Sequence, residues 1–412
     1  MYGYVIIQAM RDFDIFQAAL GLGEEWFVTK TEFDSENKRL DIYLDFQRGS
    51  KFPCPICKSP SGAYDASQQT WQHLNFFQYK TYLHAWVPRI SCDEHGVKQI
   101  SVPWARERSG FTLLFEAMIM ALVDQMPVKD IADMVGVKDT RLWRIVEYYV
   151  NQALERSDLS TVRNVGVDET SSQKGHRYVS LFVDMDTKKV IFVAKGKDSS
   201  TIQQFRDHLI KYGGLPEVIN EFSCDLSPAF ISGIQEYFPY AHITFDKFHV
   251  MKLLNNAIDE TRRNEQIEEK DLKSSRYIWL KNPENLTEKQ KKKLDSLSSL
   301  QLKTGRAYRM KLVFQQIFST EPVSFNREEA LKKWYRWAMH SRIAPIIEFA
   351  KMLKRHWNGI VRWFESNLTN AILEGLNSLV QAAKARARGF RSVEYFKLII
   401  YRVAGKLGCL PI

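Results

Sequence analysis

Three acidic residues of this chain, Asp168, Asp225 and Glu374, have the chemistry to share metal ions. Asp168 follows the short apolar run at residues 165–167 and Asp225 follows residues 218–224, so each is predicted to stand where a buried strand meets solvent. Carboxylate oxygens are hard ligands that suit Mg²⁺ or Mn²⁺, and two such ions can serve phosphoryl transfer. The simpler alternative is that these acids only end their strands.

The predicted elements decide which of these acids can meet. Three strands are followed by a helix, a strand, a helix, a strand and a helix, at residues 164–170, 178–184, 190–193, 199–212, 218–226, 228–237, 242–245 and 250–257. This is the order of a ribonuclease-H-like α/β core, in which the first and fourth strands are neighbours. Asp168 and Asp225 are therefore expected to share one edge of the sheet.

A third carboxylate comes from a predicted helix near the end of the chain. Positions 374, 377, 381, 384 and 388 are spaced by three and four, so they share one helix face. That face carries Glu374, Asn377, Gln381, Lys384 and Arg388. We interpret Glu374 as the third metal ligand and Asn377, Lys384 and Arg388 as DNA contacts. The alternative is an ordinary amphipathic helix with an exposed glutamate.

Four residues in the first hundred have the spacing of a zinc site. Cys54 and Cys57 form a C-x-x-C knuckle, and Cys92 and His95 supply a second pair 35 positions on. A Cys₃His set predicts a closed structural Zn²⁺ site. Buried free thiols beside a surface histidine are the alternative, and a redox pair is less favoured because no βαβ pattern surrounds the knuckle.

A helix-turn-helix is predicted after the zinc site. The apolar period becomes helical from residue 111, and Ala132, Gly136, Leu142 and Ile145 have the spacing of two helices joined by a tight turn. The outward residues of the last helix suit phosphates and base edges. These are Lys138, Thr140, Arg141 and Arg144. A plain helical hairpin with a solvated basic face is the alternative.

The long stretch from 261 to 360 is predicted to be helical. Its charge run at residues 288–293 is interpreted as a solvated face, and its aromatic clusters around Trp334, Trp337, Trp357 and Trp363 as core packing. A role for these aromatic side chains in stacking on bases is the less favoured alternative.

Composition agrees with a DNA partner. The 412 residues carry a net charge of +10, which favours polyanions because basic side chains release counterions from phosphates. Five cysteines spread over the chain do not suggest a disulfide framework, so a reducing compartment is expected. We recognise no signal peptide and no apolar run of membrane-spanning length, and expect a cytoplasmic, nucleoid-associated bacterial protein.

Taken together, these motifs resemble a bacterial insertion-sequence transposase with a DDE site, and the ISL-three family most closely. The resemblance covers nearly the whole chain in order and spacing. It is carried by residues 165–169, 224–225, 245–250, 307–311 and 369–390, after the Cys-x-x-Cys finger and the helix-turn-helix. His95 stands where a fourth cysteine is commoner, and Ala371 and Gln381 stand where Gly and Lys are expected.

The resemblance implies a role for each acidic residue. Asp168, Asp225 and Glu374 become the catalytic, metal-binding triad, with Glu169 only flanking it. Asp246 and His249 match a D-x-x-H motif and become site-supporting residues. The partners implied are the element's terminal inverted repeats and target DNA, bound by a homodimer, with no membrane involved.

The predicted fold class is α/β. A ribonuclease-H-like core interrupted by a helical insertion follows a small zinc-finger domain and a helix-turn-helix domain. The predicted boundaries are 1–105 for the zinc-finger region, 106–160 for the helix-turn-helix, 161–260 and 361–412 for the core, and 261–360 for the insertion. Two other functions fit some of these features: a DNA-binding regulator without catalysis, and a ribonuclease-H-like nuclease without strand transfer.

Overall fold

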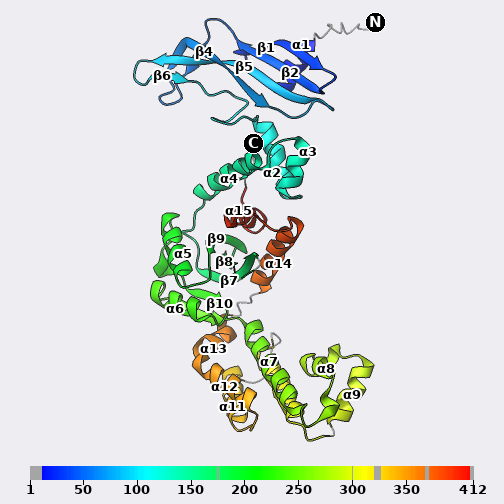
Figure 1. Ribbon diagram of the computed structural model, residues 1–412. Helices are drawn as coiled ribbons and strands as arrows, with labels where there is room; N and C mark the ends of the chain where they lie inside the picture. The colour runs from blue at the N-terminus through cyan, green and yellow to red at the C-terminus, as the bar shows by residue number, and fades with distance from the viewer. Residues whose placement is uncertain are drawn as a thin grey trace, which may run out of the picture. The chain divides into compact units, whose positions relative to one another are not determined.

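The computed structural model describes residues 12–173, 175, 177–298, 300–319, 326–366 and 371–408 (Figure 1). They form two compact units, residues 12–153 with Gly408, and Leu154–Leu407. Cys409 and the pair Thr369 and Asn370 lie outside the described residues. Within the described ranges, no helix combines the length and the apolar character that crossing a bilayer requires.

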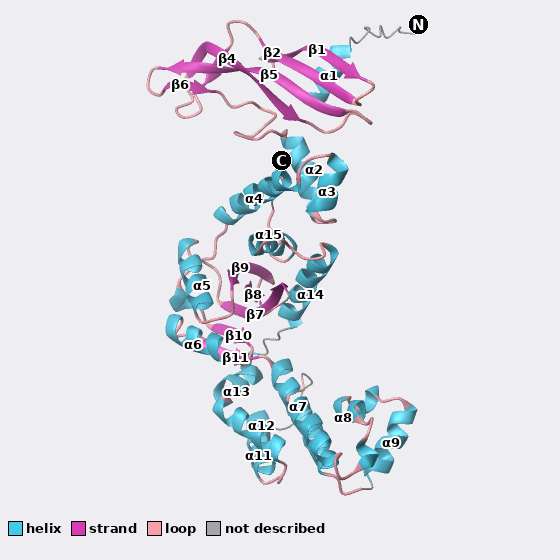
Figure 2. Cartoon of the chain, in the orientation of Figure 1, coloured by secondary structure: helices cyan, strands magenta, loops and turns pink. Residues whose placement is uncertain are grey.

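The first unit opens with a short helix and a mixed sheet of six strands. The elements are α1 (Asp12–Leu20), β1 (Trp26–Asp34), β2 (Arg39–Phe46), β3 (Lys51–Pro53), β4 (Pro60–Gln72), β5 (Lys80–Cys92) and β6 (Gly96–Gln99). The strand order is β1-β2-β5-β4-β3, with β6 beside β5. Figure 2 draws the strands of this sheet in magenta. Along β5, Leu83, Ala85 and Val87 are buried and Trp86 is exposed, as expected when one face covers a core.

Three helices follow this sheet: α2 (Leu113–Val123), α3 (Val128–Val135) and α4 (Asp139–Glu155). Gly136 ends α3 at φ 66°, and its N–H donates to the carbonyl of Ala132. This left-handed conformation strains any residue with a Cβ, which is why glycine stands at the turn. The predicted helices and turn are confirmed. The helix α4 extends to Glu155, inside the predicted boundary of the helix-turn-helix domain at residue 160.

A fully buried glutamate ties these helices to the loop that precedes them. Glu116 of α2 accepts hydrogen bonds from Arg106 Nε at 2.9 Å, from Ser109 Oγ at 2.6 Å and from Tyr149 Oη at 2.6 Å. A charge out of water is tolerated only when it is paired and hydrogen-bonded, and all three partners serve that purpose. The loop, α2 and α4 are thereby fixed to one another.

The second unit contains a five-stranded sheet. Its elements are β7 (Asn164–Gln173), β8 (Arg177–Asp184), β9 (Lys189–Lys195), α5 (Ser200–Lys211), β10 (Glu221–Cys224), α6 (Pro228–Tyr237) and β11 (His242–Phe245). The strand order is β11-β10-β7-β8-β9. β10 runs parallel to β7, with Ser223 opposite Gly166, so the predicted pairing of the first and fourth strands is confirmed. The fourth strand starts later than expected, because residues Pro216–Val218 form a 3₁₀ turn.

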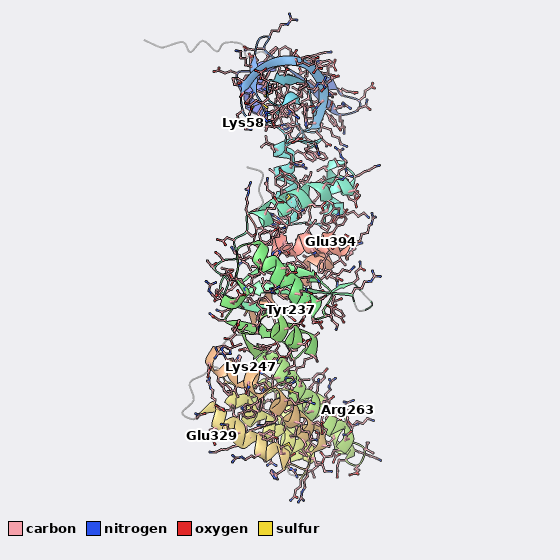
Figure 3. The ribbon with its side chains drawn as sticks, turned by 90° about the vertical axis from the view of Figure 1, so that its left-hand side faces the viewer. Lys58, Tyr237, Lys247, Arg263, Glu329 and Glu394 are labelled. Carbon is pink, nitrogen blue, oxygen red and sulfur yellow. The ribbon has the colours of Figure 1, made fainter. Side chains whose placement is uncertain are left out.

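Helices make up the rest of the second unit. They are α7 (Lys247–Glu265), α8 (Arg276–Leu280), α9 (Glu288–Ser298), α10 (Lys303–Ile317), α11 (Arg327–Met339), α12 (Ala344–Arg355), α13 (Trp357–Ser366), α14 (Ala371–Arg386) and α15 (Val393–Val403). Lys247 and Arg263, labelled in Figure 3, stand near opposite ends of α7. Trp334 and Trp363 are buried, as predicted for core packing, whereas Trp337 is exposed.

Glu265, at the end of α7, and Lys311, inside α10, join these helices. The Glu265 carboxylate accepts from the backbone N–H groups of Lys303 at 2.7 Å and Thr304 at 2.8 Å, which caps the start of α10. The fully buried Lys311 Nζ donates to the carbonyls of Trp279, Leu280 and Lys281 at 3.2, 2.6 and 3.2 Å. Three ammonium N–H groups thus satisfy three carbonyls at the end of α8.

Replacing Lys311 with Met removes these donors and keeps most of the side-chain volume. We expect the free energy of unfolding to fall by about 1–3 kcal/mol, because buried carbonyls lose their partners. Burial lowers the pKa of Lys311 to about 8. Between that pH and the ordinary value of 10.5, the unfolded chain binds more protons than the folded chain, so the wild type gains stability as pH rises.

The deficit of Lys311→Met should therefore be larger at about pH 9.5 than at about pH 7.5 in urea denaturation. The exposed Lys303 of the same helix supplies the control. Lys303→Met should leave the free energy of unfolding unchanged at both pH values. Equal stability of wild type and Lys311→Met at both pH values would contradict this role.

Candidate active site and metal centres

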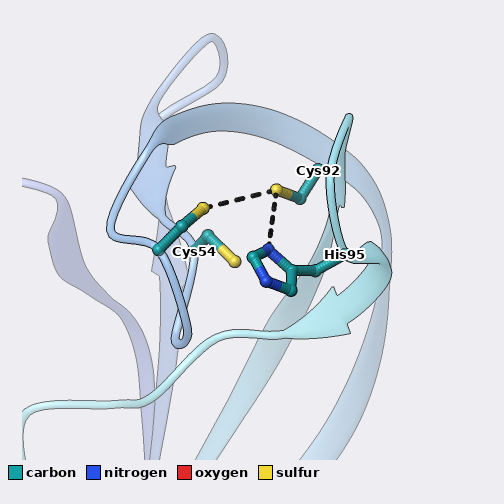
Figure 4. Close-up of side chains that lie close together, drawn as sticks. Cys54, Cys92 and His95 are labelled. Carbon is teal, nitrogen blue, oxygen red and sulfur yellow. Dashed lines mark hydrogen bonds between the residues drawn. The ribbon is translucent and has the colours of Figure 1, made fainter.

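The four predicted zinc ligands lie together in the first unit. Figure 4 labels three of them, Cys54, Cys92 and His95. One ligand atom from each of Cys54, Cys57, Cys92 and His95 lies within 4.8 Å of the others. The Cys57 and Cys92 sulfurs are 3.6 Å apart, and Cys92 Sγ is 3.7 Å from His95 Nδ1. Bonds of about 2.3 Å from zinc to sulfur in a tetrahedron give edges of about 3.8 Å, so the spacing fits Zn²⁺.

The local backbone explains why the knuckle aims both thiols at one point. The carbonyl of Cys54 accepts from the Lys58 N–H at 2.9 Å, and the Cys54 N–H donates to the Ser59 carbonyl at 2.9 Å. The second pair flanks the tight turn between β5 and β6, where Cys92 pairs with Gly96. Hydrogen bonds from Ser59 lower the pKa of the Cys57 thiol to about 6, which favours the thiolate that binds metal.

The acidic residues of the second unit gather at one edge of its sheet. The parallel pairing of β10 with β7 ends at Ser223 and Gly166. Asp168 lies further along β7, beyond that pairing, and Asp225 directly follows β10. Asp168 is therefore inside a strand that continues to Gln173, not at a strand end as predicted. Asp168 still lies at an open edge of the sheet, because β10, the strand that pairs with this side of β7, ends at Cys224.

These acids influence one another through space. Burial raises the pKa of Asp168 to about 6, and the charges of Asp225 and Asp246 act in the same direction. The backbone N–H of Glu169 and the His249 ring act against this shift. Carboxylates that lie close together and are partly buried repel one another, and a bound cation reduces that repulsion.

Asp246 and His249 form a fixed pair at the start of α7. Asp246 accepts from the Phe248 N–H at 3.0 Å and lies 2.8 Å from His249 Nδ1. The hydrogen bond to Asp246 raises the pKa of His249. The pair lies near Asp168 and Asp225, whose charges act on the same ring. Its site-supporting role stays a prediction.

The helix α14 lies beside β7 and brings the far end of the chain to this edge (Figure 1). Leu373 packs over Gly166, where a Cβ would stand 2.9 Å from Leu373 Cδ2 and 2.6 Å from Met185 Sδ. Asn377 Nδ2 donates to Asp168 Oδ2. One turn on, Gln381 Nε2 lies 2.5 Å from Thr170 Oγ1.

The same helix face continues to Lys384, whose Nζ donates to the Ser171 carbonyl at 2.5 Å. Beyond it lies an open cavity of ≈ 660 Å³, whose described lining includes no carboxylate. Among its lining residues are Gln173, Gln381, Lys384, Arg388 and Arg391. Asn377, Gln381 and Lys384 share the predicted face of α14, and this face lies against β7. The prediction was wrong for Arg388, because α14 ends at Arg386 and Arg388 stands in a left-handed turn with φ 52°. The DNA contacts assigned to Asn377, Lys384 and Arg388 stay predictions.

Glu374 is exposed in the first turn of α14. Among the described residues, the zinc ligands alone form a set of three or more metal-binding side chains within 4.8 Å of one another. Glu374 lies one helical turn before Asn377, the residue that contacts Asp168. The carboxylates of Asp168, Asp225 and Glu374 do not form such a 4.8 Å cluster. Its role as third ligand stays a prediction.

The predicted DNA-contacting residues of the helix-turn-helix are exposed. Lys138, Thr140, Arg141 and Arg144 all lie on the outer side of α4 or just before it. The Arg141 guanidinium lies 4.3 Å from the centre of the Phe111 ring, which holds it in place. Their contacts with DNA stay predictions.

Comparison with known proteins gives the family. A transposase model matches residues 165–400, the helix-turn-helix model of transposase family ISL3 matches residues 100–150, and a transposase zinc-finger model matches residues 50–95. The chain belongs to the ISL3 family of transposases. The resemblance read from the sequence is thereby confirmed.

Two curated relatives match almost the full length. The chain is 26% identical over 444 residues to the transposase for insertion sequence element IS1557 of Mycobacterium tuberculosis, covering 98% of each chain. It is 26% identical over 393 residues to the transposase for insertion sequence element IS1001 of Bordetella parapertussis, covering 93% of this chain and 96% of the relative.

Sequence reasoning missed two positioning contacts in this ISL3 protein. The hydrogen bond from Asn377 to Asp168 joins residues 209 positions apart, and no local pattern reports such a contact. The close approach at Gly166 did leave a signal, because glycine inside a strand often marks a place where another segment comes near.

One zinc ion per chain is expected in the purified protein, because a closed site of this kind holds its ion tightly. Cys92→Ser should lose most of that zinc and unfold the knuckle, as measured by elemental analysis and circular dichroism. Cys224→Ala, at a buried thiol far from the knuckle in sequence, should keep its zinc. Folded wild-type protein without zinc would contradict the assignment.

A larger residue at Gly166 should push α14 away from β7. We expect Gly166→Ala to lower the free energy of unfolding by about 1–3 kcal/mol through overpacking. Leu373→Ala removes the atoms of α14 that are in the way and leaves Met185 in place, so the double variant should lose less stability than the sum of the two single changes. Additive losses in chemical denaturation would show that the two residues do not share this contact.

Proposed function

We propose that this ISL3-family protein is a DDE transposase whose ribonuclease-H-like core is interrupted by the helical residues 261–360. The observation that carries the proposal is the sheet order β11-β10-β7-β8-β9, with acids at one edge and α14 against β7. Asp168, Asp225 and Glu374 would hold two Mg²⁺ or Mn²⁺ ions. When bound, such ions polarise the phosphodiester and lower the pKa of an attacking water or hydroxyl.

The donor set suits a hard cation. All three proposed ligands offer carboxylate oxygens, which Mg²⁺ prefers. Burial and the nearby acids raise the pKa of Asp168, so a cation there would favour its charged form. The Asn377 Oδ1 atom is also buried and has no hydrogen-bond partner, which marks an acceptor left open beside Asp168.

The chain's own residues would position the DNA. The exposed side chains of α4 would contact the terminal inverted repeats, while zinc keeps the finger folded. Lys384, Arg388 and Arg391 would receive strand phosphates in the cavity beside β7. One strand would be cut by water at the element end, and the freed 3′ hydroxyl would then attack target DNA. We propose a homodimer on DNA, acting at the nucleoid of the bacterial cytoplasm.

Neither alternative function is favoured. The transposase model spans residues 165–400, which include all three acids, so loss of the catalytic region does not apply. A nuclease without strand transfer would share the same site and would differ only in failing to join the cut end to a second DNA.

Asp168→Asn, Asp225→Asn and Glu374→Gln should each lower Mg²⁺-dependent cleavage of a labelled element end by about a thousandfold or more, because metal stabilisation of the transition state amounts to several kcal/mol. Glu169→Gln is the matched control. Glu169 directly follows Asp168 and pairs with Lys197 at 3.5 Å, so the variant should stay close to wild type.

Two results would overturn the assignment. Unchanged cleavage by any of the three variants would remove that acid from the site. Loss of cleavage in Glu169→Gln with retention in Asp168→Asn would move the first ligand by one position. Transfer of the cut end to a second labelled duplex separates a transposase from a nuclease.

A further inference from the structure

We infer that Asn377 belongs to the metal site, as the residue that orients Asp168 and supplies an additional oxygen ligand. The inference rests on the proposed function, since it concerns the same site. It gives Asn377 a role different from the DNA contact predicted from the helix face.

The first step is the orientation of the Asn377 amide. Its Nδ2 donates to Asp168 Oδ2. The opposite orientation would place the amide oxygen against the carboxylate, where two acceptors repel. The nitrogen is therefore fixed on Asp168, and the amide oxygen is fixed on the other side of the group.

The second step is that this oxygen has no partner. Asn377 Oδ1 is buried and accepts no hydrogen bond. A buried acceptor without a partner is costly and rare in folded proteins, so it calls for an explanation. An amide oxygen is a ligand that hard divalent cations accept together with carboxylates.

Asn377 also stands between the two proposed acidic ligands Asp168 and Glu374. Asn377 is three residues after Glu374, so both side chains lie on one face of α14, one turn apart. Asn377 touches Asp168, which makes it the link between the acid on β7 and the acid on α14. Gln381 and Lys384 continue the same face, but their contacts are to Thr170 and Ser171, which are not proposed ligands.

Binding of Mn²⁺ alone tests the inference without DNA or activity. Titration calorimetry of the zinc-loaded full chain should show Mn²⁺ binding by the wild type, and about 10- to 100-fold weaker binding by Asn377→Ala. Asn377→Leu keeps the side-chain volume and should show the same loss. Gln381→Ala removes the next contact between α14 and β7, and should bind Mn²⁺ like the wild type. Thermal unfolding of each variant confirms that the chain is folded.

In cleavage assays, Asn377→Ala should need a higher Mg²⁺ concentration for half-maximal rate, and saturating Mg²⁺ should recover much of that rate. Wild-type affinity in both Asn377 variants would overturn the inference. An equal loss in Gln381→Ala would also overturn it, because helix docking would then explain the effect. Asp168→Asn separates the two claims: Mn²⁺ affinity equal to the wild type there would count against the proposed metal site itself.

Discussion

The close approach of α14 to β7 at Gly166 is the constraint on which the second unit depends. Leu373 of α14 and Met185 together occupy the place that any side chain at position 166 would need. This contact lets Asn377 reach Asp168 and lets Lys384 reach the Ser171 carbonyl. A helix more than 200 residues later in the chain is thereby locked onto the strand that carries the first acid. The long helical stretch between them must then leave the sheet and return to it.

Polar contacts between helices order part of that stretch. Glu265 of α7 caps the start of α10, and Lys311 of α10 donates to the carbonyls at the end of α8, so these two residues join α7, α8 and α10. The first unit uses the same strategy, with Glu116 fully buried among three donors and a zinc site at the knuckle. A group that is expensive to bury fixes geometry well, because only one arrangement supplies all its partners.

Much of this organisation could be predicted from the sequence, because it is local. Period-two and helical patterns predicted the strands and helices of the second unit's α/β region. They also predicted the turn at Gly136 and the polar face of α14. Ligand spacing predicted the zinc set. Contacts that depend on tertiary packing could not be predicted from local sequence patterns. Nothing near Lys311 in the sequence points to the end of α8, and the extension of β7 past Asp168 depends on its pairing with β8.

The central claim is that Asp168, Asp225 and Glu374 together hold the metal ions of the proposed active site. A crystal structure of the chain with an element-end duplex and Mn²⁺ tests it directly through the anomalous signal of the metal. The account predicts a peak with an oxygen of each of the three residues at about 2.1 Å, or two neighbouring peaks that share them. A metal bound by Asp168 and Asp225 while Glu374 stays in solvent would contradict it.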